Sequence, residues 1–274
     1  MICVPIYVSI DAWRFNEELM NELNIEIPTG MWTWDDFYNL AYDVCKDLNG
    51  DVMPDVYMIE ASKRFPLFWE QYLSNSLDMI NDAVNIEEDI LLHMLDLWKK
   101  IVDSNFVLIT AIPSSRLKEN VLFAESSFSI FEGSKKYVFP PTINDKYSYL
   151  AELGYLCINR FSSNKETAAE LLEVYLRPEI RTKTIIPLKA ASFYKDLSLY
   201  NIRKELSSVY PLSNDINYEI YAKILRNSKK RMYQTDIDIY FGDIMEDYLD
   251  NKITKVEAVK LITKKLEMKR NYGY

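Results

Sequence analysis

Glycine is scarce in this chain, with 6 residues among 274, whereas about 7% is typical of proteins. Loops that cradle phosphate groups need glycine to bring backbone N–H groups close to the ligand, so the chain has little material for such a site. The motifs G-x-S-x-G, P-loop and H-E-x-x-H are also missing from the sequence. Composition and motifs therefore argue against nucleotide-binding loops and against the common hydrolases.

Histidine is almost absent, and His93 is the only one. It shares the polar face of a helix predicted over residues 87–102 with Asp96 and Lys100, a pattern that favours a solvated side chain over a catalytic base. Asp236 and Asp238 could act as paired acids, but their position at a helix start also fits capping, and two carboxylates are too few for a hard-metal site. We predict that the chain is not an enzyme and uses no metal or cofactor.

Cysteine is also rare. Cys3, Cys45 and Cys157 are odd in number and far apart along the chain, so their spacing predicts neither a disulfide framework nor a zinc site. Cys3 lies in a strand-like run and is predicted to be a core cysteine, with a lipid-modified cysteine as the alternative. The opening MICVPIYVSIDAW has no positively charged region and no small-residue cleavage site, so it is not a signal peptide.

Long apolar runs and excess positive charge are missing as well. No run approaches the ~18–20 apolar residues of a membrane span. The net charge of -9 argues against a nucleic-acid partner or an anionic membrane surface.

The pattern along the chain is helix-rich α/β, without an internal repeat. β-branched residues predict strands at residues 4–10, 55–61, 120–131 and 154–160. Apolar residues at helical spacing predict helices after Asn16, over residues 33–44, 87–102, 163–176 and 240–249, and at the C-terminus, and FPLFWEQYL (residues 65–73) is predicted to start another helix. Capping boxes are predicted at Thr33-x-x-Asp36, Ser163-x-x-Glu166 and Thr254-x-x-Glu257.

Aromatic residues are plentiful, with 20 Tyr, 12 Phe and 5 Trp. Many must form the core, but rings near loop–helix junctions also suit a sugar site, where apolar sugar faces stack on rings. Trp32 and Trp34 flank the predicted cap Thr33. Trp34 is predicted to cover the start of its helix, and Trp32 has no assigned role.

Five segments, in order, resemble the extracellular solute-binding proteins of carbohydrate ABC importers, the maltose-binding-protein-like family. The longest is VPIYVSIDAWRFNEELMNELNIEIPTGMWTWDDFYNLA, which is similar to the family's hinge strand followed by its P-x-TWdef segment. The others are NVLFAESSFSIFEGS, LGYLCINRFSSNKETAAELLEVYL, IIPLKAA and IMEDYLDNKITKVEAVKLITKKLE.

The resemblance implies a type II periplasmic-binding-protein-like architecture with two α/β lobes, the first of them incomplete. Residues 1–10 correspond to a hinge strand and residues 11–150 to the first part of the second lobe. Residues 151–204 correspond to a remnant of the first lobe, and residues 205–274 return to the second lobe as its helical part. About the first third of a family member, including its signal peptide, has no counterpart, so the chain is a fragment, an internally started product or one partner of a two-chain protein. An exposed apolar surface is expected over residues 151–200, with self-association as a consequence.

The resemblance also implies ligand positions. Stacking rings are expected at Trp13, Phe65, Trp69, Phe128 and Tyr240, each with core packing as the alternative. Phe128 follows Ser127 where the family has Gly-Trp. The expected polar partners of the solute are Glu125, Glu152 and Asp236.

The function implied is substrate capture for an ABC importer, with a carbohydrate or oligosaccharide as solute and the permease subunits as partners. The implied location is extracytoplasmic, at the cell surface or in the periplasm. The alternative is a truncated relative that serves as a protein–protein interaction module without a transport role.

Overall fold

A computed structural model describes residues 2–26, 28, 31–64, 66–78, 83–111, 118–127, 137–144, 150–176, 229–230 and 241–272. The predictions for Phe65, Phe128, Asp236, Asp238 and Tyr240 lie outside these residues, as do the IIPLKAA turn and most of residues 177–240. No helix in the described part combines the length and the apolar composition needed to cross a membrane.

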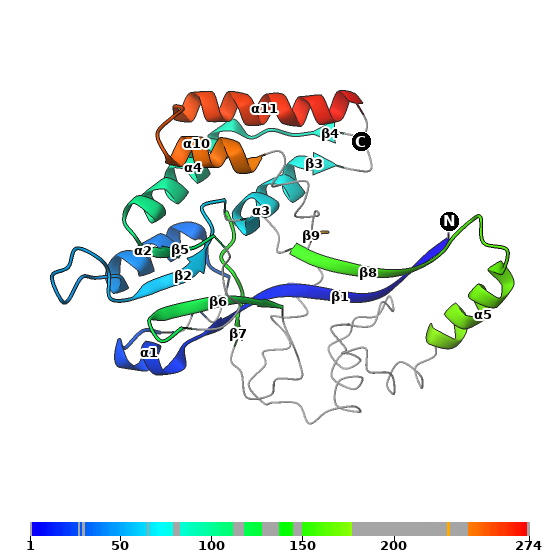
Figure 1. The fold of residues 1–274 in the computed structure, drawn as a ribbon, viewed down its shortest axis with the longest axis horizontal. Helices are drawn as coiled ribbons and strands as arrows, with labels where there is room; N and C mark the ends of the chain where they lie inside the picture. The colour runs from blue at the N-terminus through cyan, green and yellow to red at the C-terminus, as the bar shows by residue number, and fades with distance from the viewer. Residues whose placement is uncertain are drawn as a thin grey trace.

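One mixed sheet organises the described chain, in the strand order β5-β2-β6-β1-β8-β9 (Figure 1). β2 is parallel to both β5 and β6, whereas β1 is antiparallel to β6 and β8. The short β7 also pairs with β1, and β9 is parallel to β8. The bounds are β1 Ile2–Phe15, β2 Tyr57–Ala61, β5 Val107–Ile109, β6 Val121–Ser127, β7 Tyr137–Val138, β8 Leu150–Ile158 and β9 Lys229–Lys230.

Helices cover this sheet, and most begin where the sequence pattern predicts them. The predicted helix over residues 87–102 is α4, and its apolar stripe is buried around Leu91, Leu95 and Trp98. A separate two-stranded sheet pairs β3 (Leu77–Asp78) with β4 (Ala83–Val84). The helices are α1 Glu17–Glu22, α2 Trp34–Val44, α3 Pro66–Ser76, α4 Glu88–Asp103, α5 Lys165–Leu176, α10 Asp243–Leu249 and α11 Lys255–Tyr272.

Two of the three predicted capping boxes are confirmed. The Thr33 N–H donates to Asp36 Oδ2 over 2.8 Å, and the Asp36 N–H donates back to Thr33 Oγ1 over 3.2 Å. Thr254 and Glu257 make the same reciprocal pair ahead of α11. The third start is displaced by one residue, because α5 begins at Lys165 and the carbonyl of Asn164 accepts the first helical bond, from Ala168.

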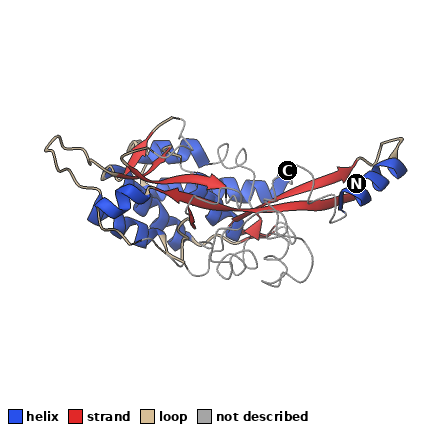
Figure 2. Ribbon diagram, turned by 90° about the horizontal axis from the view of Figure 1, so that it is seen from below, coloured by secondary structure: helices blue, strands red, loops and turns tan. Residues whose placement is uncertain are grey.

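β1 extends well beyond the strand predicted at residues 4–10 and pairs with different strands along its length. Residues 2–10 pair with β8, whereas residues 11–15 pair with β6. The strand therefore leaves one set of partners and joins another at residues 10 and 11. Figure 2 shows β1 and β8 extending together as a long ribbon away from the helical body. The lobe boundaries drawn from the resemblance stay a prediction.

The core contains an aromatic cluster formed by Trp13, Trp32, Trp34, Phe37 and Phe123. Trp13 meets Trp34 edge-on, with ring centroids 5.8 Å apart and an interplanar angle of 67°. Edge-to-face contacts of this kind are the favoured geometry for buried rings. All five rings are buried. Trp34 covers the start of α2 as predicted, and Trp32 is also core.

The two tryptophans of the W-x-W stretch join two distant segments. Trp32 Nε1 donates to the Phe139 carbonyl over 2.7 Å, and Trp34 Nε1 donates to Gln71 Oε1 over 3.0 Å. Gln71 Nε2 in turn donates to the Pro141 carbonyl over 2.8 Å. Because buried indole N–H groups need acceptors, these bonds fix the segment after β7 against α2 and α3.

Cys157 is disulfide-bonded and Cys45 is a free, buried thiol, although the spacing of the cysteines along the chain indicated no disulfide framework. Cys3, the third cysteine of the sequence, lies opposite Cys157 in the antiparallel register of β1 and β8. Spacing along the chain could not show this, because strand pairing brings together positions that are far apart in sequence.

Candidate functional site

Three parallel strands end at the same edge of the sheet. β2 ends at Ala61 and β5 at Ile109, which are opposite each other in the register, and β6 ends at Ser127. Ligands of open α/β sheets bind beyond the carboxyl ends of parallel strands. β1 crosses this carboxyl edge, since Asp11 pairs with Ser127 before the strand runs on to β8. The carboxyl edge beside β1 is therefore the candidate site.

Glu60 is a buried carboxylate one residue before the end of β2. Thr110 Oγ1 donates to Glu60 Oε1 over 3.0 Å, and Lys118 Nζ lies 3.0 Å from Oε2. A buried charge is tolerated only with such partners: Oε1 accepts a hydrogen bond, and the ion pair with Lys118 balances the charge at Oε2. The sequence analysis treated Glu60 only as part of a strand, although an acidic residue at the end of an apolar run was a usable signal.

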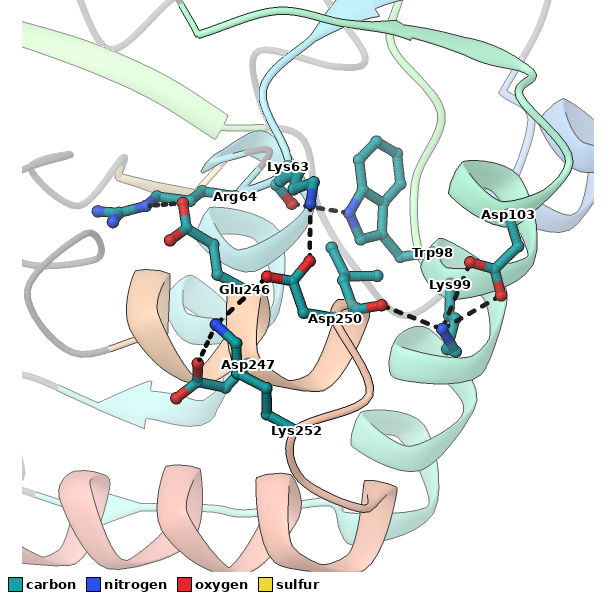
Figure 3. A network of polar contacts seen from close by, with 10 residues as sticks. Lys63, Arg64, Trp98, Lys99, Asp103, Glu246, Asp247, Asp250 and Lys252 are labelled. Atoms are coloured by element: carbon teal, nitrogen blue, oxygen red, sulfur yellow. Dashed lines mark hydrogen bonds and ion pairs between the residues drawn. The ribbon is translucent and has the colours of Figure 1, made fainter. Parts of the chain in front are cut away.

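Arg64 follows β2 and crosses to the start of α10 (Figure 3). Its Nε lies 2.9 Å from Glu246 Oε1, and an Nη atom lies 3.2 Å from Asp243 Oδ1. Gly242 permits this approach, because a Cβ atom at that position would lie 2.8 Å from Arg64 Nη1. The acidic side chains in the first turn of α10 thus hold the Arg64 guanidinium at the carboxyl edge.

Lys63 anchors the same loop to the far end of α10. Its Nζ lies 2.7 Å from Asp250 Oδ1, and its carbonyl accepts a 3.0 Å bond from Trp98 Nε1 (Figure 3). Lys252 lies 3.3 Å from the other Asp250 oxygen. The hydrogen bonds from Lys63 and Lys252 lower the pKa of Asp250 below its usual value. The loop after β2 is therefore fixed by ion pairs to an element about 180 residues away.

Behind this loop, Trp69 on α3 stacks on Phe241, with ring centroids 6.1 Å apart and an interplanar angle of 10°. Both rings are buried. Trp69 lies on the buried side of its helix and packs as core in this structure, and its role as a stacking ring for a solute stays a prediction.

The structure places three other predicted ligand residues. Trp13 is buried in the aromatic cluster, so its ring offers no surface to a solute in this conformation. Glu125 is exposed on β6, directly opposite Trp13 in the register. Glu152 lies on β8 opposite Ser9. Because Ser9 and Trp13 are about 13 Å apart along β1, the two glutamates flank β1 at different levels and do not form one cluster.

His93 has the solvated role that was predicted. Its Nε2 lies 3.0 Å from Asp35 Oδ2, and both side chains are about half exposed, at 50% and 52%. This contact joins α4 to the first turn of α2.

Arg64, Gly242, Asp243 and Glu246 were missed by the sequence analysis. The acidic first turn of α10 is visible in the sequence, but acidic first turns commonly serve only the helix dipole. Nothing in the linear sequence connects this turn to Arg64.

Sequence comparison and structure comparison with known proteins give different results. No protein-family model matches the chain, and no curated protein matches it by sequence. Solved structures match over almost its whole length. An ABC substrate-binding protein of Listeria monocytogenes, solved with cycloalternan, has a TM-score of 0.66 at 16% identity, covering 99% of this chain and 72% of its own.

Two further structures give the same result. A putative oligosaccharide periplasmic-binding protein of Synechococcus matches with a TM-score of 0.69 at 13% identity, covering 98% of this chain and 73% of its own. The cyclic α-maltosyl-1,6-maltose binding protein of Arthrobacter globiformis matches with a TM-score of 0.65 at 13% identity, covering 99% and 73%.

The chain has the fold of a type II periplasmic binding protein. Identities of 13–16% support the fold and no more. More than a quarter of each neighbour's chain has no counterpart here, as the coverage of 72–73% shows.

Proposed function

We propose that the chain is the solute-binding component of an ABC importer and captures a carbohydrate or oligosaccharide. The observation that carries this proposal is the match of 98–99% of the chain to three proteins whose names describe sugar or substrate binding. The sequence resemblance, reached from separate motifs, points to the same group of proteins.

The proposed solute position is the carboxyl edge beside β1. Arg64, with 36% of its side chain exposed, and the exposed Glu125 supply a charged donor and an acceptor there. Such groups suit sugar hydroxyls, which need hydrogen bonds in fixed directions. Phe65 and Tyr240 are the sequence neighbours of Arg64 and of buried Phe241, and they remain the proposed stacking rings together with Phe128.

The proposed partners are the permease subunits of the importer, at an extracytoplasmic location. The disulfide at Cys157 supports this location, because disulfides persist in oxidising compartments. β1 connects the two parts of the sheet, since residues 11–15 pair with β6 and residues 2–10 pair with β8.

A thermal-shift screen tests this function. We expect at least one member of a panel of maltose, linear and cyclic α-glucans and other oligosaccharides to raise the Tm of the purified chain. Glu125→Gln should reduce the affinity for that sugar about tenfold, because an acceptor of sugar hydroxyls loses its charge.

The matched control is Glu119→Gln, an exposed glutamate just before the start of the same strand. It should leave the affinity unchanged. A panel that gives no shift with correctly folded protein would count against carbohydrate capture, and equal effects of the two substitutions would remove Glu125 from the site.

A further inference from the structure

Past the carboxyl edge, the described sheet narrows to a ribbon of two strands, residues 2–10 of β1 and residues 150–158 of β8. No other described strand pairs with that part of β1, and β8 pairs with β9 only at residues 150 and 151. The ribbon extends away from the helical body (Figure 2). Because two strands alone are only marginally stable in water, the described backbone pairing gives the ribbon little stability.

A disulfide lies within this ribbon. Cys157 on β8 is disulfide-bonded and Cys45 is a free thiol, which leaves Cys3 as the remaining cysteine of the sequence. Cys3 is directly opposite Cys157 in the antiparallel register. Opposite residues of antiparallel strands have Cα atoms about 4.5–5.5 Å apart, which is within the range of about 4.4–6.8 Å that a disulfide bridges. The register therefore fits a bond across the ribbon.

The disulfide lies where an external thiol can reach it. Cys157 is an exposed residue, whereas Cys45 is buried. Exposed disulfides are the labile ones, because thiol–disulfide exchange requires access to a sulfur atom. Burial also raises the pKa of Cys45 to about 12, so at neutral pH this thiol supplies almost no thiolate that could rearrange the bond. The ribbon can therefore alternate between an oxidised and a reduced state without a competing cysteine pairing.

We propose that Cys3 and Cys157 form a cross-strand disulfide that holds the ribbon together and that an external dithiol opens. A thiolate of the dithiol attacks the Cys157 sulfur, and the Cys3 sulfur leaves and takes up a proton. The second thiol of the dithiol then attacks its partner sulfur in this mixed disulfide and releases Cys157 as a thiol. The protein disulfide gains two electrons and two protons, and the dithiol loses them and becomes a disulfide.

Reduction changes the ribbon and leaves the rest of the described sheet paired. Without the cross-link, nothing but strand pairing limits the separation of residues 2–10 from β8. α5 contacts β8, so it should lose order with the ribbon. Residues 11–15 of β1 pair with β6 and β7 and stay in place. The bond thus acts as a local redox-sensitive switch for the order of the ribbon and α5.

This inference does not depend on carbohydrate capture, so its test uses no sugar. Mass-spectrometric peptide mapping of the oxidised protein, with free thiols blocked, should recover one cross-linked peptide pair that contains Cys3 and Cys157. Dithiothreitol is the probe for reduction of the folded chain. It should cleave the bond at a rate proportional to its concentration, while Cys45 stays unlabelled by iodoacetamide.

Backbone hydrogen exchange then measures the order of the ribbon. On reduction, exchange should become about tenfold faster or more over the ribbon and α5, whereas exchange in β2, β6 and α4 should not change. Reoxidation with oxidised glutathione should restore the slow exchange. Reversal without loss of the body of the fold distinguishes a switch from general destabilisation.

Matched substitutions assign the effect to the bond. Cys3→Ser and Cys157→Ser should each exchange at the ribbon as fast as the reduced wild type and should not respond to dithiothreitol. Cys45→Ser is the control and should keep the full response. If a serine variant at position 3 or 157 does not fold, reduction of the folded wild type provides the same comparison.

Three results would overturn the proposal. In the first, peptide mapping joins Cys157 to Cys45 or to a second chain. In the second, cleavage occurs only at the rate of global unfolding, whatever the dithiothreitol concentration, so the bond is a permanent structural link. In the third, the ribbon exchanges equally fast in the oxidised and reduced protein, so the bond does not hold it.

Discussion

The described cysteines occupy two chemical states, a disulfide and a free thiol. Cys157 is disulfide-bonded, and Cys3 lies opposite it in the strand register. Cys45 is a free, buried thiol at the C-terminal end of α2, and burial raises its pKa to about 12. A thiol with that pKa stays protonated at neutral pH, and only the thiolate reacts.

Thiol titration checks these states. Purified without reductant and then denatured, the protein should release one thiol, that of Cys45. The native protein should react far more slowly, because Cys45 is buried and protonated. Cys45→Ser is the control and should give no thiol in either state. Three thiols in the denatured protein would contradict the assignment.

Asp47 organises an exposed turn through its charge. Its Oδ1 accepts the Gly50 N–H over 2.6 Å, and its Oδ2 accepts the Val52 N–H over 2.8 Å. These two bonds are the largest causes of an Asp47 pKa below its usual value of 3.8. Val52 adopts a φ of 74°, a conformation that costs a β-branched residue energy and that the turn maintains.

The acid stability of the protein should therefore depend on Asp47. Because the folded-state pKa is lowered, its contribution is complete above the unfolded-state pKa and is lost as pH falls through the folded-state value. Asp47→Asn should lower Tm at pH 6 and show a smaller further loss than wild type between pH 5 and pH 3. Asp43→Asn, an exposed carboxylate on α2, is the control and should follow the wild-type profile. An Asp47→Asn profile parallel to wild type would refute this role.

At the scale of elements, α10 holds the carboxyl edge together. Arg64 and Lys63 connect the loop after β2 to both ends of this helix, and Gly242 provides the space for Arg64. Gly242 has helical φ and ψ of -53° and -51°, so its backbone does not itself require glycine. Glycine is needed at position 242 because the Arg64 side chain passes over it.

A double-mutant cycle tests this packing. Alanine at a helical glycine position normally stabilises a protein by about 0.4–1 kcal/mol. In the Arg64→Ala background, Gly242→Ala should give that gain. With Arg64 present, the same change should destabilise the protein by about 1 kcal/mol, because the methyl group displaces the guanidinium from Asp243 and Glu246. Urea unfolding measures both differences, and equal effects in the two backgrounds would show that the contact is unimportant.

Local chemistry explains which elements were predictable. The caps at Thr33 and Thr254 and the stripe of α4 follow from neighbours within one or two turns, and all three are confirmed. The strand at residues 4–10 was predicted too short, because its continuation through Trp13 depends on pairing with β6. Arg64, Glu60 and Cys157 owe their roles to contacts with distant segments, which local patterns do not contain.

At the scale of the whole molecule, the fold expected from five ordered motifs is the one the structure shows. The expected apolar surface after residue 150 is confirmed at Phe161 and Leu171, whereas self-association through it is still a prediction. The two expected stacking rings that are described, Trp13 and Trp69, are buried. Burial and solute contact could not be separated from sequence, because both call for aromatic residues at helix and strand junctions.

Carbohydrate capture is the central claim, and isothermal titration calorimetry of the wild-type chain tests it most directly. The titration is performed with the α-glucan panel on the purified chain. The account predicts saturable heat with one site per chain for at least one sugar. If hydrogen exchange shows that the sample is folded and no sugar gives binding heat, the result would contradict it.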